Sequence, residues 1–266
     1  MSNHTARDQK YLQFILDRLD VCHAYQPQLG QGQPVSLEGF LNLYGADPFY
    51  AWFGLNNPLI YAAHKAAGGI TSIYRQIGIG CEVLFQHILM DELNLTSEQA
   101  QWSYTVSSGL RERTLTLDGR ILLADVQAAS RQQTIRDWMY HAAQQLGVDD
   151  GIRRALKGCV FEVRQGYKSK DSKRQNADIA NGSAAYKAGY LPVVVLLSTQ
   201  IDEDLASRYL LSGLLLLRGL GNSDPLNSTY AFCRDVVGYD LAKFFERNAD
   251  ALRYEIQSIV EKLLTA

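Results

Sequence analysis

The chain has 266 residues, of which 47% are hydrophobic and 20% are charged, which is the composition of an ordinary globular protein. Its net charge of −2 argues against a general coating of nucleic acid or anionic membrane, but it leaves room for a locally basic cleft. The four cysteines (Cys22, Cys81, Cys159, Cys233) have no paired spacing, which excludes a cysteine-based zinc module and argues against a disulfide scaffold. The five histidines form no metal-ligand repeat.

The N-terminal stretch MSNHTARDQKY carries charges where a signal peptide needs an apolar core. The most apolar runs, YLPVVVLLS and YLLSGLLLL, are much shorter than the roughly 20 residues that cross a bilayer. The sequence therefore predicts a soluble cytoplasmic protein.

The first part of the chain is predicted to be helical. Apolar positions at helical spacing run from residue 6 to about 24 and end before the linker QPQLGQGQP. Residues 36–66 are typical of short helices that are broken at Asn57-Pro58 and closed by Gly68-Gly69. A longer helix is expected from Thr71 to about Leu93.

After residue 96 the hydrophobic pattern changes to the alternation that is typical of strands. WSYTVSS, LRERTLTL and RILLADV alternate in this way, and Asp118-Gly119 between the last two is a strong signal for a two-residue hairpin. After a helix that begins near Ser130, GCVFEVRQGY is expected to be a strand. A helix capped by Asp171 or Ser172 and ended by Gly189 leads to YLPVVVLLS, which is apolar enough to be a buried parallel strand.

Residues 158–198 are thereby predicted to form a strand, a helix and a parallel strand in a right-handed crossover. Further helices are expected from Asp202 and from Thr229 to the end. No clear domain boundary is visible. We therefore expect one α/β domain over residues 1–266, with a helical part at about 1–95, a core at about 96–210 and C-terminal helices at about 211–266.

A lone glutamate on the expected strand GCVFEVRQGY precedes a basic stretch, which holds five cations and a single acid between Val163 and Asn176. Side chains alternate along a strand, so Glu162 and Arg164 share one face, as does Lys168 if the strand runs that far. Metal-dependent hydrolysis of a phosphodiester needs this pattern, because the carboxylate binds a divalent ion and the cation offsets charge on the phosphorane. Magnesium prefers hard oxygen ligands, so at least one further acid is expected to converge here.

Over about residues 70–210 this arrangement resembles the PD-(D/E)XK nuclease superfamily, in particular its type II restriction endonucleases. The resemblance implies a restriction-endonuclease-like central mixed sheet flanked by helices, in which a first Asp opens one strand and Glu-x-Lys lies on the next. Glu162 matches the Glu, and Arg164 stands where the family has Lys. Arginine stays protonated and cannot act as a base, so Lys168 is expected to take the place of the missing lysine. The segment Asp171-Ser172-Lys173 also fits the pattern, but it opens a helix.

Two residues qualify as the first Asp of this pattern, and hence as a Mg²⁺ ligand beside Glu162. Asp118 lies at a strand edge, as the family requires, but 44 positions before Glu162. Asp150 precedes Glu162 by 12 positions, which is a more usual gap. We rank Asp118 slightly ahead because its surroundings are more strand-like, and Asp150 stays the alternative. Glu82, on the helix before the strands, is expected to be an ordinary helix-surface group.

The basic stretch is expected to bind DNA. Lys170, Lys173 and Arg174, at a loop and a helix N-terminus, are predicted to contact phosphates. Gln175 and Asn176 are predicted to form paired hydrogen bonds with base edges, adenine being the usual partner of such amides. The resemblance implies a Mg²⁺-dependent, site-specific deoxyribonuclease that acts as a homodimer on a short palindromic site in double-stranded DNA.

Two other interpretations stay open. A catalytically inactive DNA-binding protein on a nuclease-like core would keep the basic stretch, and it would account for Arg164 in place of a lysine. A structural or regulatory helical protein with a small sheet would explain the helical ends, but it would leave the basic stretch unexplained.

Overall fold

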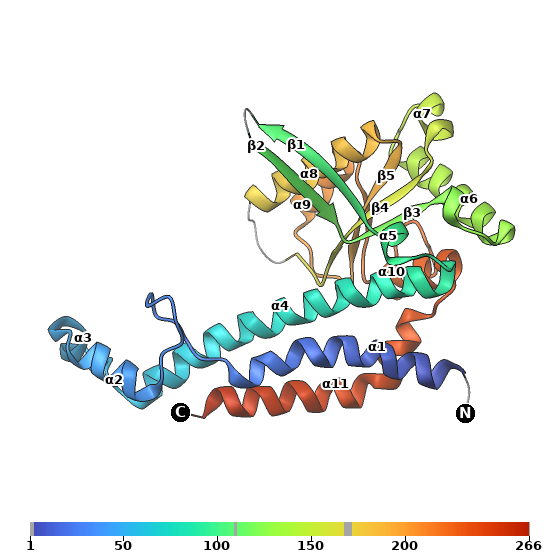
Figure 1. The fold of residues 1–266 in the computed structure, drawn as a ribbon. Coiled ribbons are helices and arrows are strands. Elements are labelled where there is room, and N and C mark those ends of the chain that lie inside the picture. Colours follow the sequence, from blue (N-terminus) through green and yellow to red (C-terminus); the bar gives the residue numbers. More distant parts are fainter. Residues whose placement is uncertain (1–2, 109–110, 168–171, 266) are drawn as a thin grey trace. The chain divides into compact units, whose positions relative to one another are not determined.

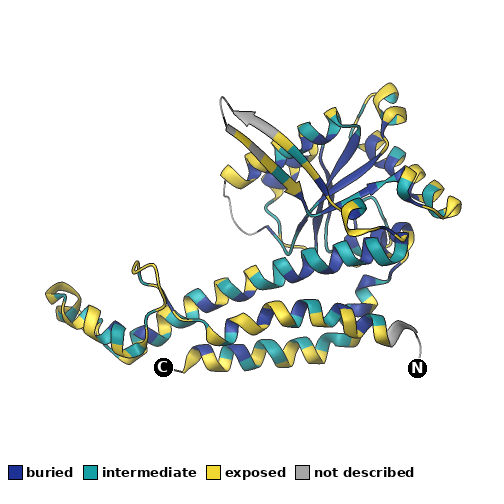
Figure 2. Ribbon diagram, viewed as in Figure 1, coloured by how far each residue is buried: buried dark blue, intermediate teal, exposed yellow. Residues whose placement is uncertain are grey.

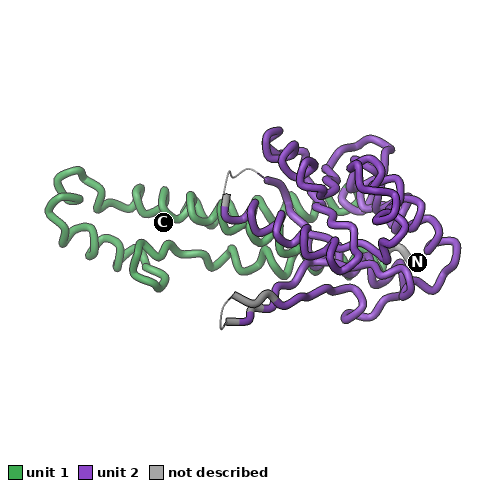
Figure 3. The backbone as a smooth tube through the Cα atoms, turned by 90° about the horizontal axis from the view of Figure 1, so that it is seen from above, with its two compact units in different colours: residues 1–80, 246–266 green, residues 81–245 purple. Residues whose placement is uncertain are grey.

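The computed structural model describes residues 3–108, 111–167 and 172–265. The chain divides into two compact units: unit 1 comprises Met1–Gly80 with Glu246–Ala266, and unit 2 comprises Cys81–Phe245 (Figure 3). The predicted core of about 96–210 lies within unit 2. The predicted helical ends are divided between the two units.

Unit 1 is helical in the part of the chain that the structure describes. It contains α1 (Asn3–Asp20), the 3-10 helix η1 (Val21–Ala24), α2 (Leu37–Gly45), α3 (Pro48–Trp52), the first part of α4 (Pro58–Leu93) and most of α11 (Leu241–Leu264). The carboxylate of Asp8 on α1 accepts hydrogen bonds from Arg247 on α11, at 2.6 and 3.1 Å. This bidentate pair joins the first and last helices of the chain.

The predicted break at Asn57-Pro58 is confirmed, because α4 begins at Pro58. The predicted end at Gly68-Gly69 and the separate helix start at Thr71 are wrong, because α4 continues through them to Leu93, over 36 residues in all. Both glycines lie against other parts of unit 1. A Cβ at Gly68 would come within 1.9 Å of the hydroxyl oxygen of Tyr25, and one at Gly69 within 2.5 Å of Leu263. Glycine disfavours a helix interior, but at these two positions it permits close packing, and the helix does not end there.

Unit 2 is built on a mixed sheet of four strands in the order β3-β4-β5-β6 (Figure 1). Strand β3 is antiparallel to β4, whereas β4, β5 and β6 are mutually parallel. The strands of this sheet are β3 (Gly119–Leu122), β4 (Gly158–Arg164), β5 (Tyr190–Leu196) and β6 (Leu215–Leu217). A separate two-stranded antiparallel sheet pairs β1 (Trp102–Ser108) with β2 (Arg111–Leu117).

Helices flank the four-stranded sheet, which confirms the α/β class. Helix α6 contacts β4, α8 contacts β5, and α9 contacts β6. The remaining elements of unit 2, besides the second part of α4 and the start of α11, are α5 (Ser97–Ala100), η2 (Leu123–Asp125), α6 (Ala129–Gln145), α7 (Asp150–Ala155), α8 (Ser172–Lys187), α9 (Glu203–Leu211), α10 (Thr229–Ala231) and the π-helix η3 (Phe232–Val237). Strand β6 was not predicted.

The predicted hairpin at Asp118-Gly119 is wrong. Strand β2 pairs with β1, and β3 pairs with β4, so the Asp-Gly pair leads the chain from one sheet into the other. The Asp118 carboxylate accepts a hydrogen bond from the backbone N–H of Val163 at 2.8 Å. This bond ties the residue to β4, and the chain therefore does not fold back on β2.

The parallel crossover of β4, α8 and β5 is confirmed, and every residue of β5 is buried (Figure 2). Phe161 of β4 packs against Phe85 and Phe232 on one side of the sheet. Val160 belongs to a cluster on the other side, with Ala185 of α8 and Trp102. Alternate residues of β4 therefore face different layers, and Glu162 and Arg164 follow Val160 on the α8 side.

Among the described residues, no helix is both long enough and apolar enough to span a bilayer.

Candidate functional site

The pairing of β3 with β4 brings the two main predicted acids together. Gly119 is paired with Phe161, so Asp118 continues the antiparallel register to the level of Glu162. Although 44 positions separate them in the sequence, the two residues meet at one end of two neighbouring strands. Arg164 lies on the same face of β4 as Glu162, and the two side chains are hydrogen-bonded.

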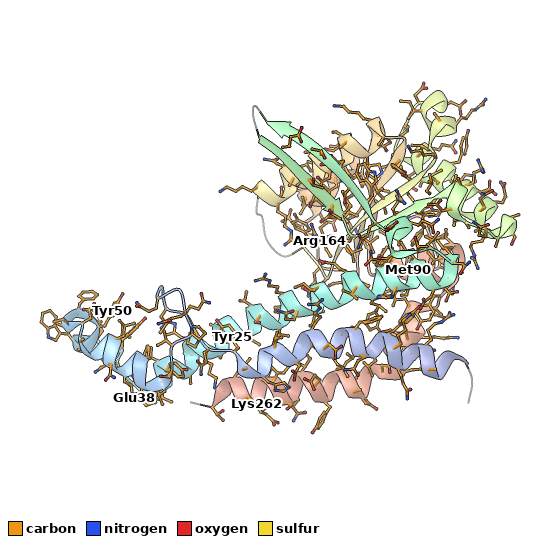
Figure 4. All side chains as sticks on the ribbon, in the orientation of Figure 1. Tyr25, Glu38, Tyr50, Met90, Arg164 and Lys262 are labelled. Carbon is orange, nitrogen blue, oxygen red and sulfur yellow. The ribbon has the colours of Figure 1, made fainter. Side chains whose placement is uncertain are left out.

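Four carboxylates surround the guanidinium group of Arg164, whose place in the fold is labelled in Figure 4. Its Nη1 lies 3.6 Å from Asp118 and 3.9 Å from Glu82, which comes from the second part of α4. Its Nη2 contacts Glu162 and lies 3.4 Å from Asp178 of α8. We call these five residues the Arg164 cluster. Glu82, expected at a helix surface, is one of its members.

The Arg164 cluster is sheltered from solvent and has an excess of acid. The exposed fractions of its side chains range from 3% for Asp178 through 12% for Arg164 to 29% for Glu82. Four carboxylates against one guanidinium give a net charge of −3 when all are ionised. Such an excess is costly in a partly buried site unless a further positive charge or protons offset it.

The pKa of Asp118 reflects this environment. Burial raises it above its ordinary value of 3.8, and the nearby Asp178 raises it further. The hydrogen bond from Val163 and the positive charges of Arg164 and Arg174 act in the opposite direction. The field of Arg174, in the first turns of α8, thus reaches the Arg164 cluster.

A buried layer lies behind Arg164. One carboxylate oxygen of Asp178 faces the guanidinium, and the other accepts hydrogen bonds from the hydroxyls of Tyr209 at 2.6 Å and Tyr167 at 3.2 Å. Burial is the main cause that raises the pKa of both tyrosines, so both stay protonated donors at neutral pH. This layer holds Asp178 in place and, through it, one side of Arg164.

Sequence reasoning missed Asp178 and both tyrosines. Gln175, Asp178, Gly182 and Ala185 recur at helical spacing in the sequence, but only the structure shows that all four are buried. An acid within a buried stripe of a helix indicates a polar partner in the fold. The sequence contains no signal that Tyr167 and Tyr209 are those partners.

The carboxylate oxygens of the Arg164 cluster suit Mg²⁺ chemically, but their present arrangement around the guanidinium does not. Carboxylate oxygens are the ligands that Mg²⁺ prefers. However, among the described residues no group of three His, Cys, Asp or Glu side chains is placed to hold a metal ion. The Arg164 guanidinium lies where the four carboxylates converge, so it would have to withdraw before a metal ion bound between them.

The alternative first acid, Asp150, is at a different place. It lies at the start of α7, where its carboxylate is 3.1 Å from Arg153 and 2.8 Å from Arg154 and accepts a hydrogen bond from the hydroxyl of Tyr140 at 3.0 Å. The structure therefore brings Asp118, and not Asp150, together with Glu162 and Arg164.

Two predicted site residues lie outside the described ranges: Lys168, the expected catalytic lysine, and Lys170, an expected phosphate contact. Lys173, Arg174 and Asn176 are exposed on α8. Strand β4 ends at Arg164, so it does not run as far as position 168, which was the condition for Lys168 to share a strand face with Glu162.

The two predicted base-reading amides are held by one arginine. Arg208 of α9 donates to the side-chain oxygen of Gln175 at 2.7 Å and to that of Asn176 at 2.6 Å. The side chain of Gln175 is buried, at 8% exposure. Of the two amides, only Asn176 is therefore presented to a ligand.

Comparison with known proteins gives no match: no family model matches the chain, and no curated protein and no solved structure is significantly similar to it.

Proposed function

We propose that the protein hydrolyses phosphodiester bonds in double-stranded DNA with Mg²⁺, and that the Arg164 cluster is its active site. One observation carries the proposal. Asp118 at the start of β3 and the Glu162-x-Arg164 segment of β4 meet on neighbouring strands, as the resemblance to PD-(D/E)XK nucleases implies for the catalytic acids. In its specific form, the proposal is a type II restriction endonuclease with a restriction-endonuclease-like core, which acts as a homodimer on a short palindromic site.

The carboxylates provide the oxygen ligands. Asp118 and Glu162, with Glu82 on the same side of Arg164 as Asp118, would hold the metal ion. The chemistry that a bound Mg²⁺ would supply there is polarisation of the phosphate and a lower pKa for a nucleophilic water molecule. Asp178 is committed to the two tyrosine hydroxyls and is less suited to this role.

Arg164 is the cation of the site. It stays protonated, so its role is to stabilise negative charge that develops on the phosphate, not to remove a proton. Its Nε is buried and has no hydrogen-bond partner among the described residues. A buried donor without an acceptor costs about 1–3 kcal/mol, and this cost favours a movement of the guanidinium towards a phosphate oxygen when DNA and Mg²⁺ bind.

The start of α8 is the proposed DNA contact. Lys173 and Arg174 are exposed there, and Arg174 lies about one helical turn before Asp178 of the Arg164 cluster on the same helix. A backbone phosphate held by Arg174 would therefore be close to the acids of the Arg164 cluster. Cations of this kind provide affinity without sequence specificity, and Asn176 is the candidate for a base contact on the same helix.

One observation favours a second function, that of a DNA-binding protein that does not cut. The guanidinium of Arg164 already provides a positive charge among the four carboxylates. If it stays there, no metal ion enters and the site has a structural role. The exposed cations of α8 would still bind phosphates.

Incubation of the purified protein with plasmid and phage DNA, with Mg²⁺ or with EDTA, separates these functions. The proposal predicts discrete fragments that require Mg²⁺ and the loss of cleavage in Glu162→Ala, whereas its DNA affinity is unchanged in a gel-shift assay. A gel shift without any cleavage by the wild type supports the non-cutting protein. If the wild type neither cuts nor shifts DNA, both functions are excluded.

A further inference from the structure

Unit 1 exposes an unusual apolar surface at α3 and the first turn of α4. Trp52 is 82% exposed, Leu59 81%, Phe53 67% and Phe49 57%. We call these four residues the apolar tip. Phe49, Trp52 and Phe53 lie at helical spacing along α3, and the rings of Phe49 and Phe53 are 5.0 Å apart. Clusters of this kind on a protein surface mark interaction sites.

The apolar tip rests on an ordered aromatic layer. Tyr50, which is 38% exposed, stacks on Tyr44 at 4.8 Å, and Tyr44 in turn contacts the fully buried Phe40 at 4.3 Å. Tyr61 and His64 of α4 also pack against Phe40. Figure 4 labels Glu38 on α2 and Tyr50 on α3, the two short helices that carry this layer. The rings are therefore held in place before any partner binds, which lowers the entropy cost of binding.

The backbone under the apolar tip is also fixed by hydrogen bonds. Asp47 caps α3, and its carboxylate accepts from the N–H of Phe49 at 2.9 Å. The side chain of Asn57 donates to the carbonyl of Gly54 and accepts from the N–H of Leu59 at 3.0 Å. The start of α3 and the connection from α3 to α4 are thereby held by hydrogen bonds, so the exposed side chains project from an ordered backbone.

The charges in the sequence around the apolar tip limit the kind of molecule that this surface can bind. The sequence has no lysine or arginine between Arg18 and Lys65, and its acids there are Asp20, Glu38 and Asp47. A surface that binds nucleic acid or anionic lipid needs cations. An apolar surface without them is suited to another apolar protein surface.

The exposed area matches that of a two-fold interface. Aromatic side chains cover about 150–250 Å² each, so the exposed fractions of the apolar tip correspond to on the order of 500 Å² of apolar surface. A homodimer interface of about 800 Å² per partner is roughly 65% apolar, which is close to this value. Asp47, whose charge is directed at the N-terminus of α3, adds little repulsion between two copies.

We propose that the apolar tip is the contact through which two copies of this chain form a dimer. The same uncharged surface is present on every copy, and a two-fold interface brings the same patch of both subunits into contact. Trp52 is at the centre of the proposed interface, because it is the most exposed ring and tryptophan is frequent among residues that dominate binding. The contact would supply the homodimer of the proposed function, but the argument for it rests on the apolar tip alone.

Sedimentation equilibrium of the full chain tests this proposal. The wild type is expected to dimerise, and Trp52→Ala is expected to raise the dissociation constant by about 30-fold, the effect of losing a dominant interface residue. Leu59→Ala should give a smaller change in the same direction. Leu211→Ala is the matched control, since Leu211 is 89% exposed in unit 2 and lies outside the apolar tip.

Three results would overturn the proposal. The first is a wild type that stays monomeric up to about 100 μM. The second is a dimer whose dissociation constant is the same in Trp52→Ala and Leu59→Ala. The third is a monomer that binds phosphatidylcholine vesicles through Trp52, which would assign the surface to a membrane. Because every readout is a mass or a binding constant, failure here leaves the proposed cleavage chemistry standing.

Discussion

Asp118 and Asp150, the two acids that the sequence offers as partners of Glu162, lie in opposite electrostatic settings. At α7, one carboxylate faces two arginines, and its side chain is 42% exposed. At the junction of β3 and β4, four carboxylates share one arginine, and Arg164 is 12% exposed. The negative charge of Asp150 is balanced by Arg153 and Arg154 on the same short helix. The Arg164 cluster has an excess of buried negative charge, which costs stability and therefore points to a ligand that supplies positive charge.

The largest difference between the two regions should be seen when their arginines are removed. Arg164→Met takes the single cation from four partly buried acids, so we expect a loss of about 3–5 kcal/mol in the free energy of unfolding. Arg154→Met is the control. Its side chain is 75% exposed, and its loss should cost less than about 1 kcal/mol. Urea denaturation measures both values.

Two further variants keep this comparison informative if Arg164→Met does not fold. Arg164→Lys retains the charge and should recover part of the loss. The combination of Arg164→Met with Asp118→Asn, which also removes an acid, should be more stable than Arg164→Met alone. Equal effects of the substitutions at Arg164 and Arg154 would mean that the Arg164 cluster is no more strongly coupled than an ordinary surface pair.

The buried layer behind Arg164 should give an effect of intermediate size. Tyr209→Phe removes the 2.6 Å hydrogen bond to Asp178 and leaves a buried carboxylate oxygen less well satisfied. We expect it to lower the free energy of unfolding by about 1–3 kcal/mol. Tyr167→Phe removes the longer, 3.2 Å bond to the same oxygen and should cost less. The reverse order in thermal or urea unfolding would contradict the assigned roles of the two hydroxyls.

The smallest expected effect concerns Asp118 and pH. Its pKa is raised in the folded state, mainly by burial, so folding favours the protonated form. The stability that protonated Asp118 contributes is fully present below pH 3.8, the ordinary pKa of an aspartate. It is lost as the pH rises through the raised pKa of the folded state. Asp118→Asn cannot ionise. Its free energy of unfolding should therefore increase relative to that of the wild type as the pH rises through the raised pKa of Asp118.

Asp150→Asn is the control for this titration. It loses two ion pairs at the surface of α7, so it should be slightly less stable than the wild type at neutral pH. Urea unfolding at a series of pH values compares the three proteins. The distinction between the two sites would be removed if Asp150→Asn were more stable to unfolding than the wild type. It would also be removed if the difference in unfolding free energy between Asp118→Asn and the wild type did not change with pH.

The local part of the Arg164 cluster was predictable from the sequence. Strand periodicity places Glu162 and Arg164 on one face of β4, and their hydrogen bond confirms this. Asp118 was chosen for its strand-like surroundings, but its predicted hairpin is wrong. An Asp-Gly pair also permits a change from one sheet to another, and the bond to Val163, 45 positions away, decides between these outcomes.

The missed features depend on distant packing. Gly68 and Gly69 indicate a helix end when only their neighbours in sequence are considered, and only Tyr25 and Leu263 explain why the helix continues. Strand β6 is part of an apolar run of leucines that fits a helix equally well. Tyr209 becomes a partner of Asp178 through the packing of α9 against α8, which no periodicity in the sequence reveals.

The cleavage rate of DNA as a function of Mg²⁺ concentration, compared between Asp118→Asn and Asp150→Asn, tests the central claim most directly. If the Arg164 cluster is the active site, Asp118→Asn should cut at least about 10³-fold more slowly than the wild type, although it is no less stable and binds DNA equally well. Asp150→Asn should cut at close to the wild-type rate. Equal rates in the two variants, or a loss of cleavage in Asp150→Asn alone, would contradict the account.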